Sequence, residues 1–287
     1  MRILITGAHG FIGFWLSRRL SYENGIKVVT NSRTDGDTTS PLFWSKLGKF
    51  DCVIHLADKN DINESWSCPN DFAVSNASSI TNAIQYCAKN KSRLIYPSSF
   101  LYKQNGHAAY NEDCELKAYN PYACSKIYSE NLISIFRDTG FLDAYIIRLF
   151  NVYGPMQKSS FLIPEIISQL KNGNGIYLRD LNPIRDYIYI EDVTEVIYKL
   201  LHYTGLKNVF NVGSGVGHSV YEVAEAINEL SGKNCSINSS KKRRKNEINS
   251  AIADISRIKE ELKFQPKYSL KDGLALTLKS HKLLKKL

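Results

Sequence analysis

Tyr122 and Lys126 have the residue types and the spacing that acid–base chemistry requires. They stand four residues apart, so a helix would place both side chains on one face. A free tyrosine has a pKa of about 10, and a neighbouring ammonium favours the phenolate and lowers that pKa. The pair therefore predicts a catalytic tyrosine acid assisted by a lysine, and an ordinary pair on a helix surface is the alternative.

Ser98 and Ser99 follow a short apolar run over residues 94–97. The carboxyl end of a central strand is where open α/β sheets bind their ligands. A hydroxyl at that place can donate a hydrogen bond to an oxygen on which negative charge develops. We therefore predict Ser98 as a catalytic hydroxyl, with a plain turn at this serine pair as the alternative.

A glycine-rich turn joins the first apolar run to a segment of helical period. Its spacing is GxxGxxG, and a strand followed by a helix is the context that a dinucleotide site needs. Side chains there would block the pyrophosphate, and the helix N-terminus offers it unpaired N–H groups and a positive dipole. The turn predicts that the cofactor contacts Gly7, Gly10, Phe11, Ile12 and Gly13.

The end of the next predicted strand indicates which dinucleotide is bound. NAD sites usually have a carboxylate there for the ribose 2′-hydroxyl. Here the strand ends in Asn31, Ser32 and Arg33, and an arginine with a serine can bind a 2′-phosphate. We therefore expect NADP(H). The alternative is NAD(H), with Asp35 or Asp37 reaching the ribose from a shifted loop.

Elements that would position these residues alternate along the chain, with short apolar runs between longer segments of helical period. The apolar runs predict strands at 3–6, 27–30, 52–56, 94–97, 144–149 and 209–212. Helices are expected to start near Phe11, Asn76, Tyr122, Asp192 and Ser219. This order predicts an α/β fold with a doubly wound parallel sheet, the Rossmann fold.

The domain organisation follows from where this alternation ends. We expect an NADP-binding Rossmann domain over residues 1–155, to which residues 186–214 return. After residue 155 the pattern becomes irregular, with turn-rich stretches at 171–183 and 231–250. Residues 156–287 are therefore expected to form mainly a smaller, discontinuous lobe that binds the substrate.

Composition excludes several other classes of protein. The chain has 287 residues and a formal net charge of +9. Its densest basic run, residues 241–245, has no interleaved aromatic residues for stacking on bases, so we expect acidic small ligands and no nucleic acid. The sequence contains no run of 18 apolar residues, and the first predicted strand leaves no room for a signal peptide. We therefore expect a cytoplasmic protein without a membrane partner. The six cysteines lack a CxxC spacing, which indicates reduced thiols and no metal site.

Several segments together resemble the nucleotide-sugar-modifying branch of the extended short-chain dehydrogenase/reductases, the NAD-dependent epimerase/dehydratase family. Residues 51–57 are similar to the third-strand stretch of that family, which implies that Leu56 and Ala57 line the cofactor. Asn76 matches an asparagine on the following helix, which also implies a place at the cofactor. Residues 98–102 resemble the family's serine segment, and counting back from Tyr102 selects Ser98 as the catalytic serine.

The same resemblance implies a set of substrate-binding residues. Residues 148–155 are a specific match that places Asn151 against the substrate phosphates, and residues 185–193 are a strong match that places Arg185 at the diphosphate. Near the C-terminus, Arg244 is assigned to the diphosphate and Glu247 to the nucleotide ribose. Arg243 is an alternative to Arg244, because the basic run leaves the register open.

Departures from the family pattern narrow the reaction. The 4,6-dehydratases of this family carry an acidic pair after the catalytic hydroxyl residue, where this chain has Ser99 and Phe100. Ser99 is expected to contact the substrate instead. The epimerase-reductase that makes a GDP-fucose-type sugar uses a cysteine and a histidine, where this chain has Phe100 and Phe161. Dehydration and C3/C5 epimerisation are therefore both disfavoured.

Two reactions at C4 remain. We expect NADPH-dependent reduction of the 4-keto group of a nucleoside-diphosphate 4-keto-6-deoxy sugar, for a surface polysaccharide such as a lipopolysaccharide O-antigen. The alternative is a 4-epimerase on tightly bound NAD. A possibility from another class is a catalytically silent NADP-binding sensor or scaffold, but such members typically lose the tyrosine or the lysine, and both are present here. The resemblance also implies a homodimer.

Overall fold

The computed structural model describes residues 1–103, 109–173, 175–242 and 248–284. The chain divides into two compact units. Residues 1–103, 112–149 and 194–210 form the first unit, and residues 104–111, 150–193 and 211–287 form the second. Among the described residues, no helix is both long and apolar enough to cross a membrane.

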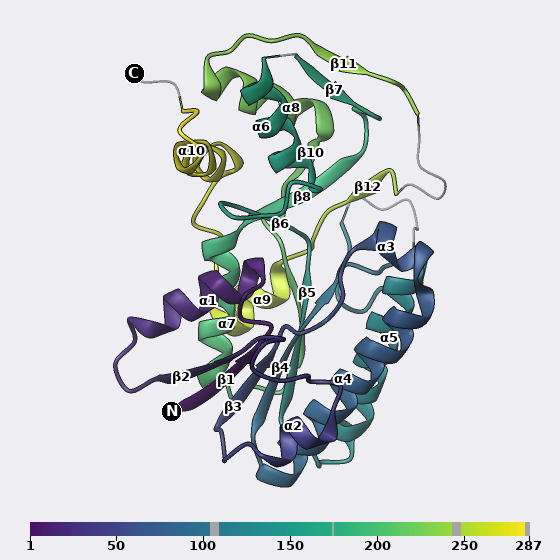
Figure 1. Ribbon diagram of the computed structural model, residues 1–287, viewed down its shortest axis with the longest axis vertical. Helices are drawn as coiled ribbons and strands as arrows, with labels where there is room; N and C mark the ends of the chain where they lie inside the picture. Colours follow the sequence, from purple (N-terminus) through teal and green to yellow (C-terminus); the bar gives the residue numbers. More distant parts are fainter. Residues whose placement is uncertain (104–108, 174, 243–247, 285–287) are drawn as a thin grey trace. The chain divides into compact units, whose positions relative to one another are not determined.

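A six-stranded sheet organises the first unit (Figure 1). Its strands lie in the order β2-β1-β3-β4-β5-β9, and β1 to β5 pair in parallel. Their bounds are β1 (Arg2–Thr6), β2 (Lys27–Asn31), β3 (Cys52–His55), β4 (Arg93–Ser99), β5 (Ala144–Leu149) and β9 (Val209–Val212). Every residue of β3 and β5 is buried, as expected for strands covered on both faces. The predicted doubly wound parallel sheet is confirmed.

Helices cover both faces of this sheet. Figure 1 shows α4 (Pro69–Asn90) and α5 (Pro121–Asp138) side by side on one face, with α1 (Phe11–Ser21) and α7 (Ile190–His202) on the other. Two short helices, α2 (Pro41–Ser45) and α3 (Ile62–Ser67), lie in the connections. The expected start of a helix near Asn76 is wrong, because Pro69 occupies the first turn, where a missing N–H does no harm.

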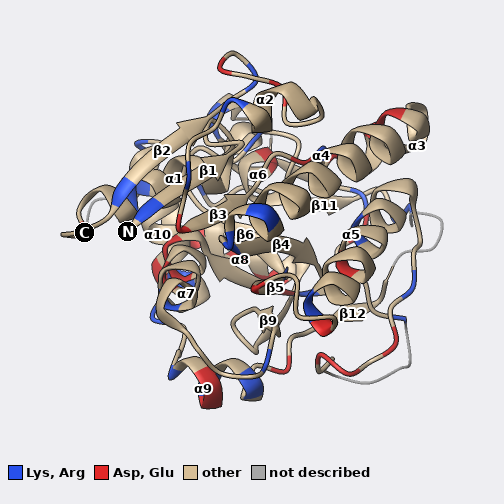
Figure 2. Ribbon diagram, turned by 90° about the horizontal axis from the view of Figure 1, so that it is seen from below, with Lys and Arg blue, Asp and Glu red and all other residues tan. Residues whose placement is uncertain are grey.

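The core of this unit lies between the sheet and the pair α4–α5. Fully buried side chains from both layers pack together there, including Val53, Leu94, Ile146, Ile80, Ile84 and Ile133. Burying one such side chain is worth roughly 1.5–3 kcal/mol, so this layer holds α5 firmly against β4 and β5. Basic and acidic positions are interspersed along the ribbon of the described residues in Figure 2.

The second unit is built around a small mixed sheet. Its central strand β8 (Ile184–Tyr189) pairs in parallel with β6 (Asn151–Tyr153) and β12 (Ser250–Ala251), and antiparallel with β10 (Gly217–Ser219). A separate parallel pair joins β7 (Ile176–Leu178) to β11 (Ile237–Ser239), inside the two stretches expected to be irregular. The helices of this unit are α6 (Leu162–Asn172), α8 (Val220–Ser231), α9 (Ser256–Leu262) and α10 (Leu270–Ser280).

Candidate active site

The glycine turn brings three pieces of backbone into close contact. Gly7 has a φ of +67°, and a Cβ there would lie 2.7 Å from the carbonyl carbon of Leu56. A Cβ on Gly13 would lie 2.5 Å from the Gly7 oxygen. Helix α1 begins at Phe11 without a side-chain cap and without an acidic residue in its first turn. This backbone cradle with open N–H groups fits the pyrophosphate of a dinucleotide.

The loop after β2 contains the residues predicted to bind the 2′-phosphate of NADP or the ribose 2′-hydroxyl of NAD. The Ser32 hydroxyl and backbone N–H donate to Asp35 Oδ2 over 2.7 and 2.8 Å, and the Asn31 amide donates to the Ser32 and Gly36 oxygens. Asn31 and Ser32 therefore hold the loop itself. Hydrogen bonds from Ser32 lower the pKa of Asp35, which remains a carboxylate, and Arg33 is exposed.

Tyr122 and Lys126 both lie near the start of α5 and are buried. Asn120 caps this helix by accepting a 2.7 Å hydrogen bond from the Ala123 N–H, which fixes the first turn. The Lys126 Nζ donates to the Pro97 oxygen over 2.7 Å. The lysine thus reaches the end of β4, next to the serine pair.

Asp58 is a site residue that the sequence analysis missed. Its Oδ2 lies 2.7 Å from Lys126 Nζ and accepts a 2.6 Å hydrogen bond from the Tyr96 hydroxyl. Lys126 also lies 4.4 Å from the centroid of the Tyr96 ring. The signal in the sequence was a charged residue directly after the predicted cofactor-lining residues Leu56 and Ala57, at the carboxyl end of a strand.

The pKa of Tyr122 is raised in this environment, contrary to the lowering that the sequence predicts. Burial raises it most, because the phenolate loses its hydration. The Lys126 ammonium and a hydrogen bond with the Ser99 side chain act in the opposite direction. The lysine therefore has the predicted effect, but burial outweighs it.

The two serines have different surroundings. Ser98 is 3% exposed, and within the described part of the chain its Oγ has no hydrogen-bond partner. A buried hydroxyl without a partner is costly, so this atom fits a ligand oxygen. Ser99 hydrogen-bonds Tyr122, and its predicted contact with the substrate stays a prediction.

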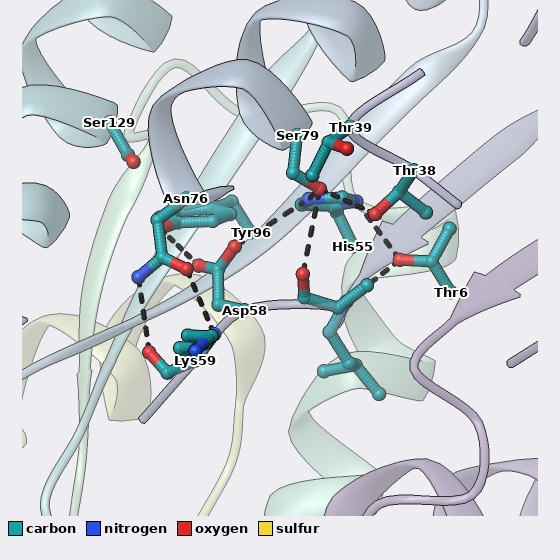
Figure 3. Close-up of polar contacts among 12 residues, drawn as sticks. Thr6, Thr38, Thr39, His55, Asp58, Lys59, Asn76, Ser79, Tyr96 and Ser129 are labelled. Atoms are coloured by element: carbon teal, nitrogen blue, oxygen red, sulfur yellow. Dashed lines mark hydrogen bonds and ion pairs between the residues drawn. The ribbon is translucent and has the colours of Figure 1, made fainter. Parts of the chain in front are cut away.

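Asn76 braces the segment that follows β3. Its Oδ1 accepts from the Lys59 N–H over 2.8 Å, and its Nδ2 donates to the Lys59 oxygen (Figure 3). The same Nδ2 also donates to Ser125 Oγ over 2.9 Å. Its amide group joins the backbone next to Asp58 to helix α5. The predicted place of Asn76 at the cofactor stays a prediction.

His55 ends β3 inside a buried polar network (Figure 3). Its Nδ1 lies 2.9 Å from Thr6 Oγ1, and its Nε2 lies 3.0 Å from Ser79 Oγ. Ser79 in turn donates to Thr38 Oγ1. Burial lowers the pKa of His55 to about 4, so the imidazole is neutral at pH 7.

The predicted substrate residues that the structure describes in the second unit lie on neighbouring strands. Asn151 of β6 donates to the Asp186 oxygen over 3.0 Å, and Arg185 precedes Asp186 in β8. The buried Asp186 carboxylate accepts from Ser214, Gly215 and Ala253, which fixes the loop after β9. The predicted residues Arg244 and Glu247, and the alternative Arg243, lie outside the described residues.

Comparison with known proteins identifies the family. The family model described as NAD dependent epimerase/dehydratase family matches residues 3–213. The uncharacterized UDP-glucose epimerase YtcB of Bacillus subtilis is 26% identical over 96% of each chain. The GDP-6-deoxy-D-talose 4-dehydrogenase of Aggregatibacter actinomycetemcomitans is 27% identical over 80% of each.

A solved structure is similar over almost the whole fold. The UDP-glucose 4-epimerase of Thermotoga maritima, crystallised with UDP-glucose, has a TM-score of 0.91 and 25% identity, covering 98% of this chain and 99% of that chain. These findings confirm the resemblance that the motifs indicate. Because the family model spans 211 of 287 residues (3–213), the chain belongs to the NAD dependent epimerase/dehydratase family.

Proposed function

We propose that this protein is an NADPH-dependent reductase of the C4 keto group of a nucleoside-diphosphate 4-keto-6-deoxy sugar. The observation that carries the proposal is the environment of Tyr122. Tyr122 is buried on the same helix as Lys126, its phenol is protonated at neutral pH because burial raises a pKa that is ordinarily about 10, and a reduction needs a proton donor at the oxygen that receives charge. The 4-dehydrogenase among the relatives supports a redox reaction at C4.

Each residue of the site has a role in this reaction. The bound nicotinamide supplies the hydride. Tyr122 donates its proton to the alkoxide oxygen that forms at C4, and Ser98 Oγ donates a hydrogen bond to the same oxygen. Lys126 holds the nicotinamide ribose. Arg185 binds the diphosphate of the nucleotide, and this remote binding energy positions the sugar.

NADPH is the proposed cofactor because of the loop after β2. Arg33 is exposed there, and a guanidinium suits a 2′-phosphate. Asp35, hydrogen-bonded to Ser32, is the group that favours NAD, since a carboxylate repels a phosphate and accepts from a ribose hydroxyl. The proposal is that the charge of Arg33 outweighs that of Asp35.

Tyr122→Phe tests the catalytic assignment. We expect kcat to fall by about 100-fold or more, within the range for loss of a general acid, while the Kd for NADPH changes little. Steady-state kinetics and fluorescence titration of NADPH measure the two quantities. Retained turnover with weakened NADPH binding would show that Tyr122 belongs to the cofactor site and not to the chemistry.

A second candidate is a nucleotide-sugar 4-epimerase, favoured by the epimerase relative and the epimerase structure. Such an enzyme oxidises and re-reduces C4 on a nicotinamide that stays bound. Denaturing the purified protein and quantifying the released nucleotide separates the two candidates. Stoichiometric NAD favours the epimerase, whereas protein that is free of nucleotide and oxidises added NADPH favours the reductase.

Homodimerisation is part of the proposal as well. Exposed apolar side chains on α4 and α5, including Val74, Tyr128 and Ile135, offer a surface for a second copy. Light scattering at micromolar concentration measures the mass directly. A mass of one chain would remove this part of the proposal without affecting the reaction.

A further inference from the structure

Asp58 is a buried carboxylate whose partners are all parts of the first unit. Its side chain is 4% exposed. One oxygen, Oδ2, contacts both the Lys126 ammonium and the Tyr96 hydroxyl. The other, Oδ1, is buried without a hydrogen-bond partner among the described residues and lies 3.7 Å from His55 Nε2 (Figure 3). Because His55 is neutral at pH 7, Lys126 is the charge that balances this carboxylate.

The contact with Asp58 changes what Lys126 can do for Tyr122. A lysine alone would stabilise the phenolate through its positive charge. A carboxylate 2.7 Å from the same ammonium cancels much of that field. The Asp58 contact, the Pro97 oxygen and the Tyr96 ring also hold the ammonium in one place.

We propose that Asp58 is a positioning residue that fixes the Lys126 ammonium and offsets its charge at Tyr122, so that Tyr122 works as a proton donor. The charge balance stands on the geometry alone. The use of Tyr122 as a donor rests on the proposed function, because reduction at C4 is the direction that needs a protonated tyrosine.

The charged and polar groups that face Tyr122 come from three elements. Lys126 and Glu130 lie on α5, Asp58 follows β3, and Ser99 ends β4. Asp58 and Glu130 raise the pKa of Tyr122, whereas Lys126 and Ser99 lower it. Removing the charge of Asp58 leaves Lys126 opposed by Glu130 and burial alone, so the phenolate becomes easier to form.

The test is a direct titration of Tyr122 in the full chain with the substitution Asp58→Asn. Tyrosine labelled with ¹³C at Cζ reports ionisation by NMR, and the resonance that disappears in Tyr122→Phe is that of Tyr122. We expect the titration midpoint to fall by about one pH unit or more, because an asparagine of the same shape removes only the charge. The alkaline limit of the reduction rate should fall by the same amount.

Asp58→Ser is a second variant, which keeps a hydroxyl acceptor for Lys126 if Asp58→Asn does not fold. Asp71→Asn is the matched control, because the exposed Asp71 carboxylate lies 3.1 Å from another lysine, the half-buried Lys59, and the net charge changes equally. We expect no change of the Tyr122 midpoint in the control. An unchanged or raised midpoint in both Asp58 variants, or an equal fall in Asp71→Asn, overturns the proposal.

The titration needs no sugar, which separates this inference from the proposed function. A lowered midpoint in a protein that reduces no 4-keto sugar would contradict the proposed reaction and leave the charge balance in place. An unchanged midpoint in an active reductase would contradict the proposed role of Asp58 and would not affect the proposed reaction.

Discussion

Arg148 and Glu130 form a buried, two-pronged ion pair that ties the sheet to helix α5. Arg148 Nε and Nη2 donate to Glu130 Oε2 over 3.0 and 2.7 Å. Arg148 is the register partner of Ser98 in the neighbouring strand, and Glu130 lies on the same helix as Tyr122. The pair therefore links the serine of the candidate site to the helix that carries the tyrosine.

Removing one member of the ion pair between Arg148 and Glu130 should lower the free energy of unfolding. Arg148→Met leaves the Glu130 carboxylate buried without its partner, and we expect a loss of about 3 kcal/mol in the free energy of unfolding. Urea denaturation measures the loss. The double variant Arg148→Met/Glu130→Met should recover part of it, because no buried charge remains. A single variant as stable as the wild type would show that the pair contributes little.

Acid should destabilise the protein through His55. Burial lowers its pKa from 6.5 to about 4, so between these values the unfolded chain binds a proton that the folded chain does not. The contribution of His55 to the free energy of unfolding is therefore fully present above about pH 6.5. It falls by about 3 kcal/mol as the pH approaches 4. Urea denaturation at several pH values measures the slope.

His55→Gln is the control for that slope, since it keeps polar atoms and removes the titration. The variant should lose less stability than the wild type between pH 6.5 and 4. Equal slopes in the two proteins would assign the acid sensitivity to other groups.

Gly13 should tolerate no side chain. A Cβ at this position would lie 2.6 Å from the Ala8 Cα as well as 2.5 Å from the Gly7 oxygen, and both are backbone atoms that cannot move aside. We expect Gly13→Ala to lower the free energy of unfolding by about 1–3 kcal/mol and to weaken binding of the nicotinamide cofactor. Gly48→Ala, whose Cβ would meet only the flexible end of Arg2, is the control.

Cofactor choice is tested at the loop after β2. Arg33→Ala should raise the Kd for NADPH by about tenfold or more, the worth of a charge-assisted hydrogen bond, and leave the Kd for NADH almost unchanged. Asp35→Asn should lower the Kd for NADPH, because it removes a carboxylate near the proposed site of the 2′-phosphate. Fluorescence titration gives both constants. Equal weakening of the two cofactors by Arg33→Ala would show that Arg33 does not read the phosphate.

Local sequence patterns predicted much of the sheet. The strands at 144–149 and 209–212 have the predicted bounds, because continuous apolar runs between turn signals are typical of strands buried on both faces. The start of α4 was placed seven residues too late, because the apolar residues 72–74 of its first turns stand side by side and show no helical period. The short strands β7 and β11 were missed, since three residues are too few to show a period.

The candidate site was predictable only where spacing within one element determines it. Tyr122 and Lys126 share one helix, so their proximity follows from the sequence alone. Asp58 and Tyr96 meet Lys126 through the order of strands in the sheet, which no local pattern encodes. The hydrogen bond of Ser99 with Tyr122, and the lack of a partner for Ser98 Oγ among the described residues, likewise depend on how the end of β4 faces α5.

The most direct test of the reaction follows the absorbance of NADPH with a small panel of nucleotide-linked 4-keto-6-deoxy sugars. We expect stoichiometric oxidation of NADPH by one of them, with a C4 alcohol as the product. No net oxidation of NADPH, together with interconversion of a saturated nucleotide hexose at C4, would contradict the reductase and establish the epimerase.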